Sequence, residues 1–184
     1  KMSRFMSKKY ASLVPYTPGE QPKERKYLKL NTNESPFPPS EKAIEYASEA
    51  AKSLQLYSDP ECTPLHSAFA KMCGVSEDMV LATNGSDEIL NFAFMAFCDE
   101  KKGIAFPSIS YGFYPVFAEL NHIPYKEIPL KGDFSIDVED YCHIGMNIVI
   151  ANPNAPTGLA LTTEQIEKIV TTNADSVVII DEAY

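Results

Sequence analysis

Residues 177–184 read VVIIDEAY, in which four β-branched apolar residues precede two acids, an alanine and a tyrosine. A strand this apolar is normally buried on both faces, as the strands of parallel sheets are. An acid at the end of such a strand, here Asp181, lies at the rim of a hydrophobic core rather than on open surface. The stretch therefore predicts a buried parallel strand that ends in a carboxylate.

Strand and helix patterns alternate through the chain ahead of this stretch. Helix 86–98 is apolar nearly all round, which predicts that it is buried or forms part of a subunit interface. Short strands separated by helices are typical of an α/β fold, with a mostly parallel sheet covered by helices on both faces. We predict strands at 79–83, 103–106, 124–130, 147–151 and 177–181, and helices at 86–98, 111–120 and 163–172, the last with a capping box at Thr162 and Gln165.

The N-terminal region is rich in Pro and Asn and lacks sustained periodicity. We therefore interpret residues 1–38 as an N-terminal arm with one short strand at 27–30. Helical patterning begins after Ser40, a suitable N-cap. A second helix is predicted from Thr63 to Met72, with Gly74 as its stop.

Composition excludes several classes of protein. The formal net charge is −9 and the 16 Lys and Arg residues are scattered, which argues against a nucleic-acid partner. The apolar stretches are too short to cross a membrane and the N-terminus lacks the apolar region of a signal peptide, so a soluble, cytoplasmic protein is expected. The cysteines are far apart, which favours free buried thiols over disulfides or a metal site: Cys62, Cys73, Cys98 and Cys142.

The turn after the first predicted strand, TNGSDE at 83–88, can bind an anion. Gly85 permits a tight turn, and Ser86 and Asp87 then occupy the first helical positions, where free N–H groups and the helix dipole favour negative charge. An ordinary helix cap would use the same residues. The chain contains neither a Walker loop nor a GxGxxG fingerprint, which disfavours an ATP or NAD site.

Three further strand ends carry polar or aromatic residues, and ligands of open parallel sheets bind at such ends. Tyr111 begins a helix and could stack on a flat heterocycle, but aromatics at helical spacing are more often core residues, and Phe113 and Tyr114 fit that pattern. The turn NPNAPTG at 152–158 could hold an Asn amide over a ligand or be a structural loop. Asp181 needs a partner, and the protonated ring nitrogen of a cofactor is one. Together these features indicate a phosphorylated aromatic ring cofactor.

Seven motifs share their order and spacing with one family: LVPYTPGEQP, LNTNESPFPP, LQLYSDPE, NGSDEIL, FPSISYGFYPVF, NPNAPTG and VVIIDEAY. The chain resembles fold-type I pyridoxal-phosphate aminotransferases, and most closely the histidinol-phosphate aminotransferase family. The resemblance implies pyridoxal 5'-phosphate as cofactor, a homodimer, and amino transfer between histidinol phosphate and 2-oxoglutarate in histidine biosynthesis. It also implies that residues 39–184 are the first part of the large cofactor-binding domain.

The resemblance further implies roles for individual residues. Asp181 and Tyr184 are the catalytic residues it assigns to this chain. Tyr57 is implied to act across the dimer interface on the partner's cofactor, and Tyr16 and Asn33 to line the substrate pocket. The implied cofactor contacts are Gly85, Ser86 and Asp87 with the phosphate, Tyr111 stacked on the pyridine ring, Asp181 on the ring nitrogen, and Tyr184 on the ring hydroxyl.

Two departures from the family pattern affect these expectations. The family has an Asn directly before PTG that bonds the ring hydroxyl, whereas this chain has Ala155 there and Asn154 one place earlier. Either Asn154 takes over that bond or Tyr184 makes it alone. The family's Schiff-base lysine lies in a Ser-Lys turn beyond DEAY, so the chain is interpreted as the N-terminal half of the enzyme, inactive by itself and lacking the small C-terminal domain.

Other functions stay open on the sequence. An aromatic or broad-range aminotransferase and a threonine-phosphate decarboxylase would use the same cofactor. A non-catalytic binding or dimerisation module could keep the same fold.

Overall fold

The computed structural model describes residues 4–10, 24–25 and 27–184 of the chain, which form two compact units. One unit comprises Thr83–Tyr184 together with residues 4–10, and the other lies within Tyr16–Ala82. The expected division into an arm up to residue 38 and a domain from residue 39 stays a prediction.

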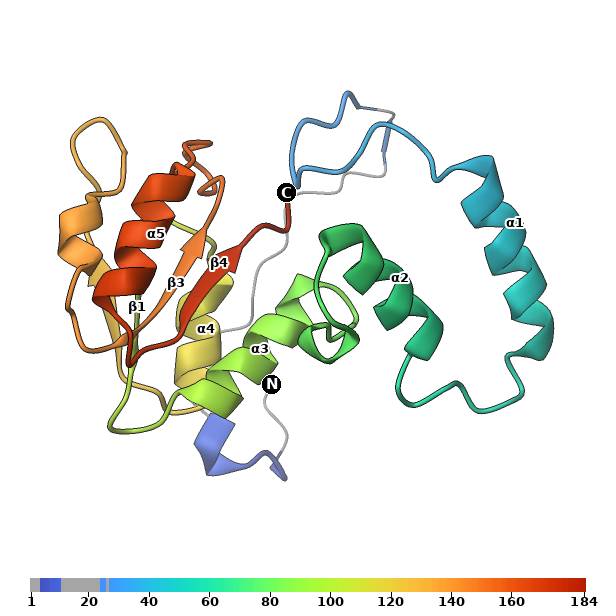
Figure 1. Cartoon of the computed structure of the whole chain (residues 1–184), viewed down its shortest axis with the longest axis horizontal. Coiled ribbons are helices and arrows are strands. Elements are labelled where there is room, and N and C mark those ends of the chain that lie inside the picture. The colour runs from blue at the N-terminus through green and yellow to red at the C-terminus, as the bar shows by residue number, and fades with distance from the viewer. Residues whose placement is uncertain (1–3, 11–23, 26) are drawn as a thin grey trace. The chain divides into compact units, whose positions relative to one another are not determined.

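The first unit contains a four-stranded parallel sheet in the order β2-β1-β3-β4 (Figure 1). The sheet and its helices confirm the predicted α/β fold. In the register of the sheet, Ile104 lies beside both Tyr125 and Asn147, and Ala151 lies beside Asp181. The strands are β1 (Ile104–Pro107), β2 (Tyr125–Ile128), β3 (Asn147–Ala151) and β4 (Val178–Asp181).

Helices cover both faces of this sheet, as predicted (Figure 1). One face packs against α3 (Ser86–Phe97) and α4 (Phe113–Leu120). The other packs against α5 (Thr163–Thr172) and the 3-10 turn η4 (Val138–Tyr141). Successive residues of a strand point to opposite faces, so each strand supplies both hydrophobic clusters and the sheet is buried from both sides.

Local signals set the ends of several helices. The capping box before α5 is present, because the Thr162 hydroxyl accepts from the Gln165 N–H while the Gln165 side chain accepts from the Thr162 N–H. In the second unit, α1 (Glu41–Ala50) begins after its predicted N-cap Ser40 and continues as a 3-10 turn over Ala51–Ser53. Helix α2 (Thr63–Cys73) ends at Gly74, whose φ of +70° suits glycine. Two further 3-10 turns are η1 (Lys8–Tyr10) and η3 (Glu77–Met79).

Two predicted strands do not form. Residues 27–30 are irregular, and the stretch predicted as strand 79–83 begins inside η3. Val80 has an extended backbone, but within the described part of the chain residues 80–83 pair with none of the four strands. The reason is physical: an extended apolar segment becomes a strand only when a neighbour completes its hydrogen bonds.

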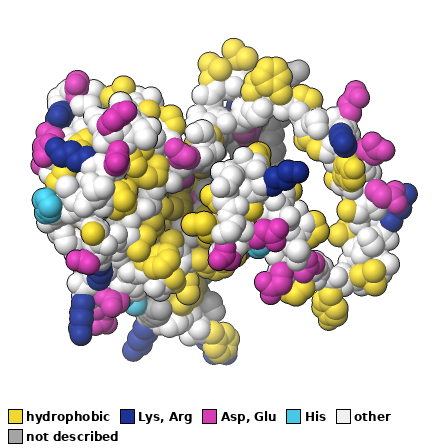
Figure 2. All heavy atoms as spheres, viewed as in Figure 1, with side chains coloured by type: hydrophobic (Ala, Val, Ile, Leu, Met, Phe, Trp, Pro, Cys, Tyr) yellow, Lys and Arg dark blue, Asp and Glu magenta, His cyan; other side chains and the backbone are white. Residues whose placement is uncertain are grey.

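Helix α3 is buried on one side only, whereas the prediction allowed either burial or a subunit interface. Leu90 and Phe94 are buried, but Phe92, Met95 and Phe97 are exposed, and hydrophobic side chains reach the surface in this area (Figure 2). The reason is that one sheet face contacts only one side of a helix. A subunit interface on the exposed side stays a prediction.

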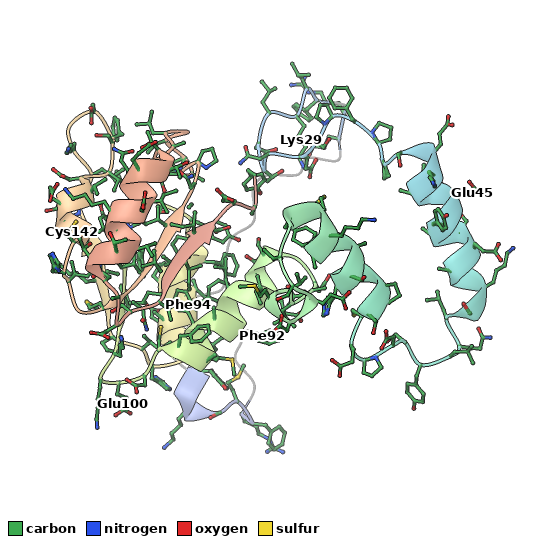
Figure 3. The ribbon with its side chains drawn as sticks, viewed as in Figure 1. Lys29, Glu45, Phe92, Phe94, Glu100 and Cys142 are labelled. Carbon is green, nitrogen blue, oxygen red and sulfur yellow. The ribbon has the colours of Figure 1, made fainter. Side chains whose placement is uncertain are left out.

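All four cysteines are free, as predicted, but they are not all buried. Cys62 and Cys73, at the two ends of α2, are exposed. Cys98 and Cys142 are half-buried; Figure 3 labels the second. No helix among the described residues has both the length and the apolar character needed to cross a membrane.

The two neighbouring phenylalanines of α3 provide a test of the packing (Figure 3). Phe94 is completely buried, whereas Phe92 is 45% exposed. In the full-length gene product, Phe94→Ala should lower the free energy of unfolding by about 3–5 kcal/mol, because it opens a cavity beside the sheet. Phe92→Ala should cost about 1 kcal/mol or less. Urea denaturation followed by circular dichroism measures both; equal losses would contradict the assigned orientation of α3.

Candidate functional site

A cleft lies at the carboxyl ends of the strands in the first unit, where the sequence predicted a ligand. It encloses about 380 Å³, part of it open to solvent. The structure brings together four of the predicted site residues there, from three separate stretches of sequence. The cleft is lined by Ser86, Tyr111, Ala151, Pro153, Ala155, Asp181, Ala183 and Tyr184.

The N-terminus of α3 forms one side of the cleft. Gly85 is the N-cap with a φ of +78°, and it has no side chain with which to cap the helix. The Asn84 N–H just before it donates to the Glu88 carboxylate at 2.8 Å, while the Gly85 N–H donates to the Thr83 carbonyl at 3.0 Å. The N–H groups of the first helical turn are therefore without a side-chain cap and suited to an anion.

Tyr111 forms an aromatic plate beside this helix end. Its hydroxyl donates to the Asp87 carboxylate at 2.7 Å, and its ring meets Tyr114 edge-on at 5.6 Å between centroids. Phe113 stacks on it at 5.7 Å. Contacts at both the hydroxyl and the ring restrict the side chain, which suits a surface for stacking a flat ligand. Since the Asp87 carboxylate is directed to Tyr111, an anion would meet the backbone N–H of Asp87 rather than its side chain.

Asp181 ends β4, is half-buried and lines the cleft. Its Oδ2 accepts from the Tyr114 hydroxyl at 2.7 Å, and its Oδ1 accepts from the Ala183 N–H at 3.3 Å. Burial, followed by the hydrogen bond to Asp181, raises the pKa of Tyr114 far above its ordinary value. The phenol therefore stays protonated and acts as a donor to the carboxylate.

Sequence reasoning treated Tyr114 as a core residue and missed this contact. The side chain is indeed completely buried, but its hydroxyl reaches the site. A signal was present, because a buried tyrosine needs a partner for its hydroxyl where a phenylalanine would not. The sequence did not indicate which residue that partner is.

The Asn154 side chain is buried and directed toward the segment that follows β1 rather than toward the cleft. Its Nδ2 donates to the Ile109 carbonyl at 3.0 Å, and its Oδ1 accepts from the Ser110 hydroxyl at 2.7 Å. Ala155, not Asn154, lines the cleft. The geometry therefore does not support Asn154 as a replacement for an amide at position 155, because its amide already bonds to Ile109 and Ser110.

The remaining predicted residues belong to the second unit or lie outside the described residues. Asn33 and Tyr57 belong to the second unit, where both are exposed. Tyr16 lies outside the described residues. Their roles stay predictions. Among the described residues there is no cluster of three His, Cys, Asp or Glu side chains that could hold a metal ion.

The sequence matches a known family and its relatives. The family model for class I and II aminotransferases matches residues 25–184. Histidinol-phosphate aminotransferases of Brachyspira hyodysenteriae and of Marinomonas sp. are 48% and 51% identical to this chain. Each alignment covers 100% of this chain and 52% of the relative. The chain thus spans about half the length of the curated relatives it matches.

Solved structures show the same fold. The aspartate aminotransferase of Thermotoga maritima is 25% identical and superposes with a TM-score of 0.73, over 82% of this chain and 44% of that one. The histidinol-phosphate aminotransferase of Sinorhizobium meliloti, solved with pyridoxal-5'-phosphate, is 20% identical, also with a TM-score of 0.73, over 82% of this chain and 42% of that one. The second likeness concerns the fold alone.

The buried position of Asn154 can be tested by its removal. In the full-length gene product, Asn154→Ala should lower the free energy of unfolding by about 1–3 kcal/mol, because it leaves the Ile109 carbonyl and the Ser110 hydroxyl unpaired. Asn84 is exposed, so Asn84→Ala serves as a control and should change the free energy of unfolding by less than about 0.5 kcal/mol. Thermal and urea denaturation measure both. A neutral Asn154→Ala would refute the assignment of its amide to Ile109 and Ser110.

Proposed function

Since this chain belongs to the class I and II aminotransferase family, we propose that the full-length gene product is a pyridoxal-phosphate-dependent histidinol-phosphate aminotransferase. It moves an amino group between histidinol phosphate and 2-oxoglutarate in histidine biosynthesis. The observation that carries the proposal is the cleft, in which an uncapped helix end, an aromatic plate and a carboxylate meet. The substrate follows from the relatives named above, which are histidinol-phosphate aminotransferases.

The residues of the cleft fit a phosphorylated pyridine ring. The first-turn N–H groups of α3 and the Ser86 hydroxyl suit the phosphate, and Tyr111 offers a ring for stacking. Asp181 provides a carboxylate within the same cleft. Such a cofactor, when bound, supplies an electron sink for the substrate carbanion.

The chain's own side chains have distinct tasks in this proposal. Asp181 keeps the ring nitrogen protonated, because a carboxylate in a partly dry site favours a cationic partner. Tyr184, which lines the cleft, donates to the ring hydroxyl. Ala155 lines the cleft with a methyl group and cannot make that bond, so Tyr184 makes it alone. The backbone N–H groups of Ser86 and Asp87 hold the phosphate.

The proposal also includes the oligomeric state, the cellular location and the binding partners of the protein. We expect a cytoplasmic homodimer in which Tyr57 contacts the phosphate of the partner subunit's cofactor. Tyr16 and Asn33 are assigned to the substrate pocket. The amino donor and the 2-oxo acid are small molecules, and no nucleic acid or membrane takes part.

Substrate comparison tests the proposed reaction directly. The full-length gene product should bind pyridoxal 5'-phosphate and transaminate histidinol phosphate with 2-oxoglutarate at a higher kcat/KM than phenylalanine. Asp181→Asn should keep much of its cofactor and lose about 10²–10³-fold in kcat, because the charge on the ring nitrogen's partner is gone. Steady-state kinetics and the absorption of the bound cofactor provide the measurements.

The matched control is Glu182→Gln, which removes an exposed carboxylate next in sequence and should leave kcat within about twofold. Near-normal turnover by Asp181→Asn would refute the role of that acid. Preference for phenylalanine would refute the substrate, as would decarboxylation of threonine phosphate. Absence of any cofactor binding would indicate a binding module of the same fold.

Complementation tests whether Tyr57 acts in trans. Tyr57→Ala and Asp181→Asn should each be poorly active as homodimers. If Tyr57 serves the partner's site, a mixed dimer contains one site with both native residues, so mixing should restore up to about a quarter of wild-type activity. Mixing two samples of the same variant is the control. No recovery in dimers that have demonstrably exchanged subunits would place Tyr57 in its own subunit's site or outside the site.

A further inference from the structure

The Tyr114 side chain connects the core to the cleft. It lies in the first turn of α4 and is completely buried, yet its hydroxyl donates to Asp181 Oδ2 at 2.7 Å across 67 residues of sequence. Asp181 in turn lines the cleft. The bond therefore joins a residue without solvent contact to Asp181, which is the one carboxylate among the described residues that line the cleft.

We propose that Tyr114 is a positioning residue, which orients the Asp181 carboxylate from inside the core toward a cationic ring nitrogen in the cleft. This inference rests on the proposed function, because it names the group that Asp181 would face. Tyr114 itself touches neither the substrate nor the cofactor in this proposal.

The donors around Asp181 support this role. Each carboxylate oxygen has two acceptor sites, and Tyr114 takes one on Oδ2 while the Ala183 N–H takes one on Oδ1. These two bonds fix the plane of the carboxylate and leave acceptor capacity for a ligand. A hydrogen bond from a neutral donor to an ionised carboxylate is stronger than one between neutral groups. A carboxylate oriented in advance loses less conformational freedom when its ligand binds.

Packing alone does not account for the hydroxyl. The Tyr114 ring contacts Phe106 at 5.7 Å and Tyr111 at 5.6 Å between centroids, which a phenylalanine ring could do equally well. On the other face of the sheet, Tyr141 is also fully buried, but its hydroxyl has no hydrogen-bond partner among the described residues. Tyr141 therefore provides a matched control for removal of a buried hydroxyl.

The test compares two cofactors on the full-length apo-protein: pyridoxal 5'-phosphate and its 1-deaza analogue, in which carbon replaces the ring nitrogen. Wild type should bind the first more tightly. Tyr114→Phe should weaken binding of pyridoxal 5'-phosphate by about 3–10-fold, because the carboxylate is no longer oriented in advance, and leave the Kd of the analogue unchanged. Tyr141→Phe should change neither Kd. Fluorescence titration of the apo-protein measures all six constants without reference to activity.

A double mutant tests whether Tyr114→Phe alters cofactor binding through Asp181. In the Asp181→Asn background, Tyr114→Phe should cause no further loss of preference for the ring nitrogen. Equal weakening of both cofactors by Tyr114→Phe, or no change in either, would overturn the positioning role while leaving the proposed function intact. If wild type bound neither cofactor, the proposed function would fail and this inference with it.

A measurement on the unsubstituted side chain keeps the inference testable if Tyr114→Phe does not fold. Wild-type protein carrying ¹³C only at Cζ of Tyr114 should show a larger change in that resonance with pyridoxal 5'-phosphate than with the deaza analogue. The reason is that a cationic partner on Asp181 alters the carboxylate to which the phenol donates. Equal changes with the two cofactors would overturn the inference.

Discussion

The parallel pairing of β3 with β4 is the interaction on which the rest of this unit depends. In its register Ala151 lies beside Asp181, so both strands end at the same level. The Asn152 N–H then donates to the Asp181 carbonyl at 2.9 Å, which adds one hydrogen bond beyond the last residue of β3. The 152–158 turn consequently leaves the sheet directly beside the acid, and the two meet in the cleft.

Burial of the sheet on both faces explains why the polar groups gather at one edge. Val149 packs on the side of α3 and α4, whereas Ile148 and Ile150 pack on the side of α5. A charged side chain on either face would lose its hydration without a partner. Only the strand ends leave room for a carboxylate or a polar turn, which is where ligands of open α/β sheets bind.

The polar residues near the cleft divide into two kinds. Asn154 is buried and bonded within the protein, so it stiffens the surroundings of the site. Ser86 and Tyr184 line the cleft and are available to a ligand. Asp181 belongs to both kinds, because it accepts from Tyr114 and Ala183 on the protein side and still lines the cleft. Asp181 therefore links the packed core to the residues available for a ligand.

The sequence by itself determined those parts of the molecule whose signals are local. The bounds of β3 and α5 agree with the predicted ones, because a run of β-branched residues and a capping box each act within a few residues. The tight turn at Gly85 could be predicted for a similar reason, because the freedom of glycine to adopt a positive φ is a property of that single residue. Asp181 could be placed at the cleft because parallel strands bring their carboxyl ends to one edge, whereas the site role of Tyr184 came from the family resemblance.

Tertiary structure alone decided what depends on a distant neighbour. Residues 79–83 have strand-like composition but lack a paired strand among the described residues, and no local pattern reveals that lack. The direction of the Asn154 amide depends on the Ile109 carbonyl, 45 residues earlier, which needs a donor. The partner of the Tyr114 hydroxyl is 67 residues away, beyond any periodicity. Hydrogen bonds between such distant groups form only after the chain has packed, so their geometry is a property of the fold.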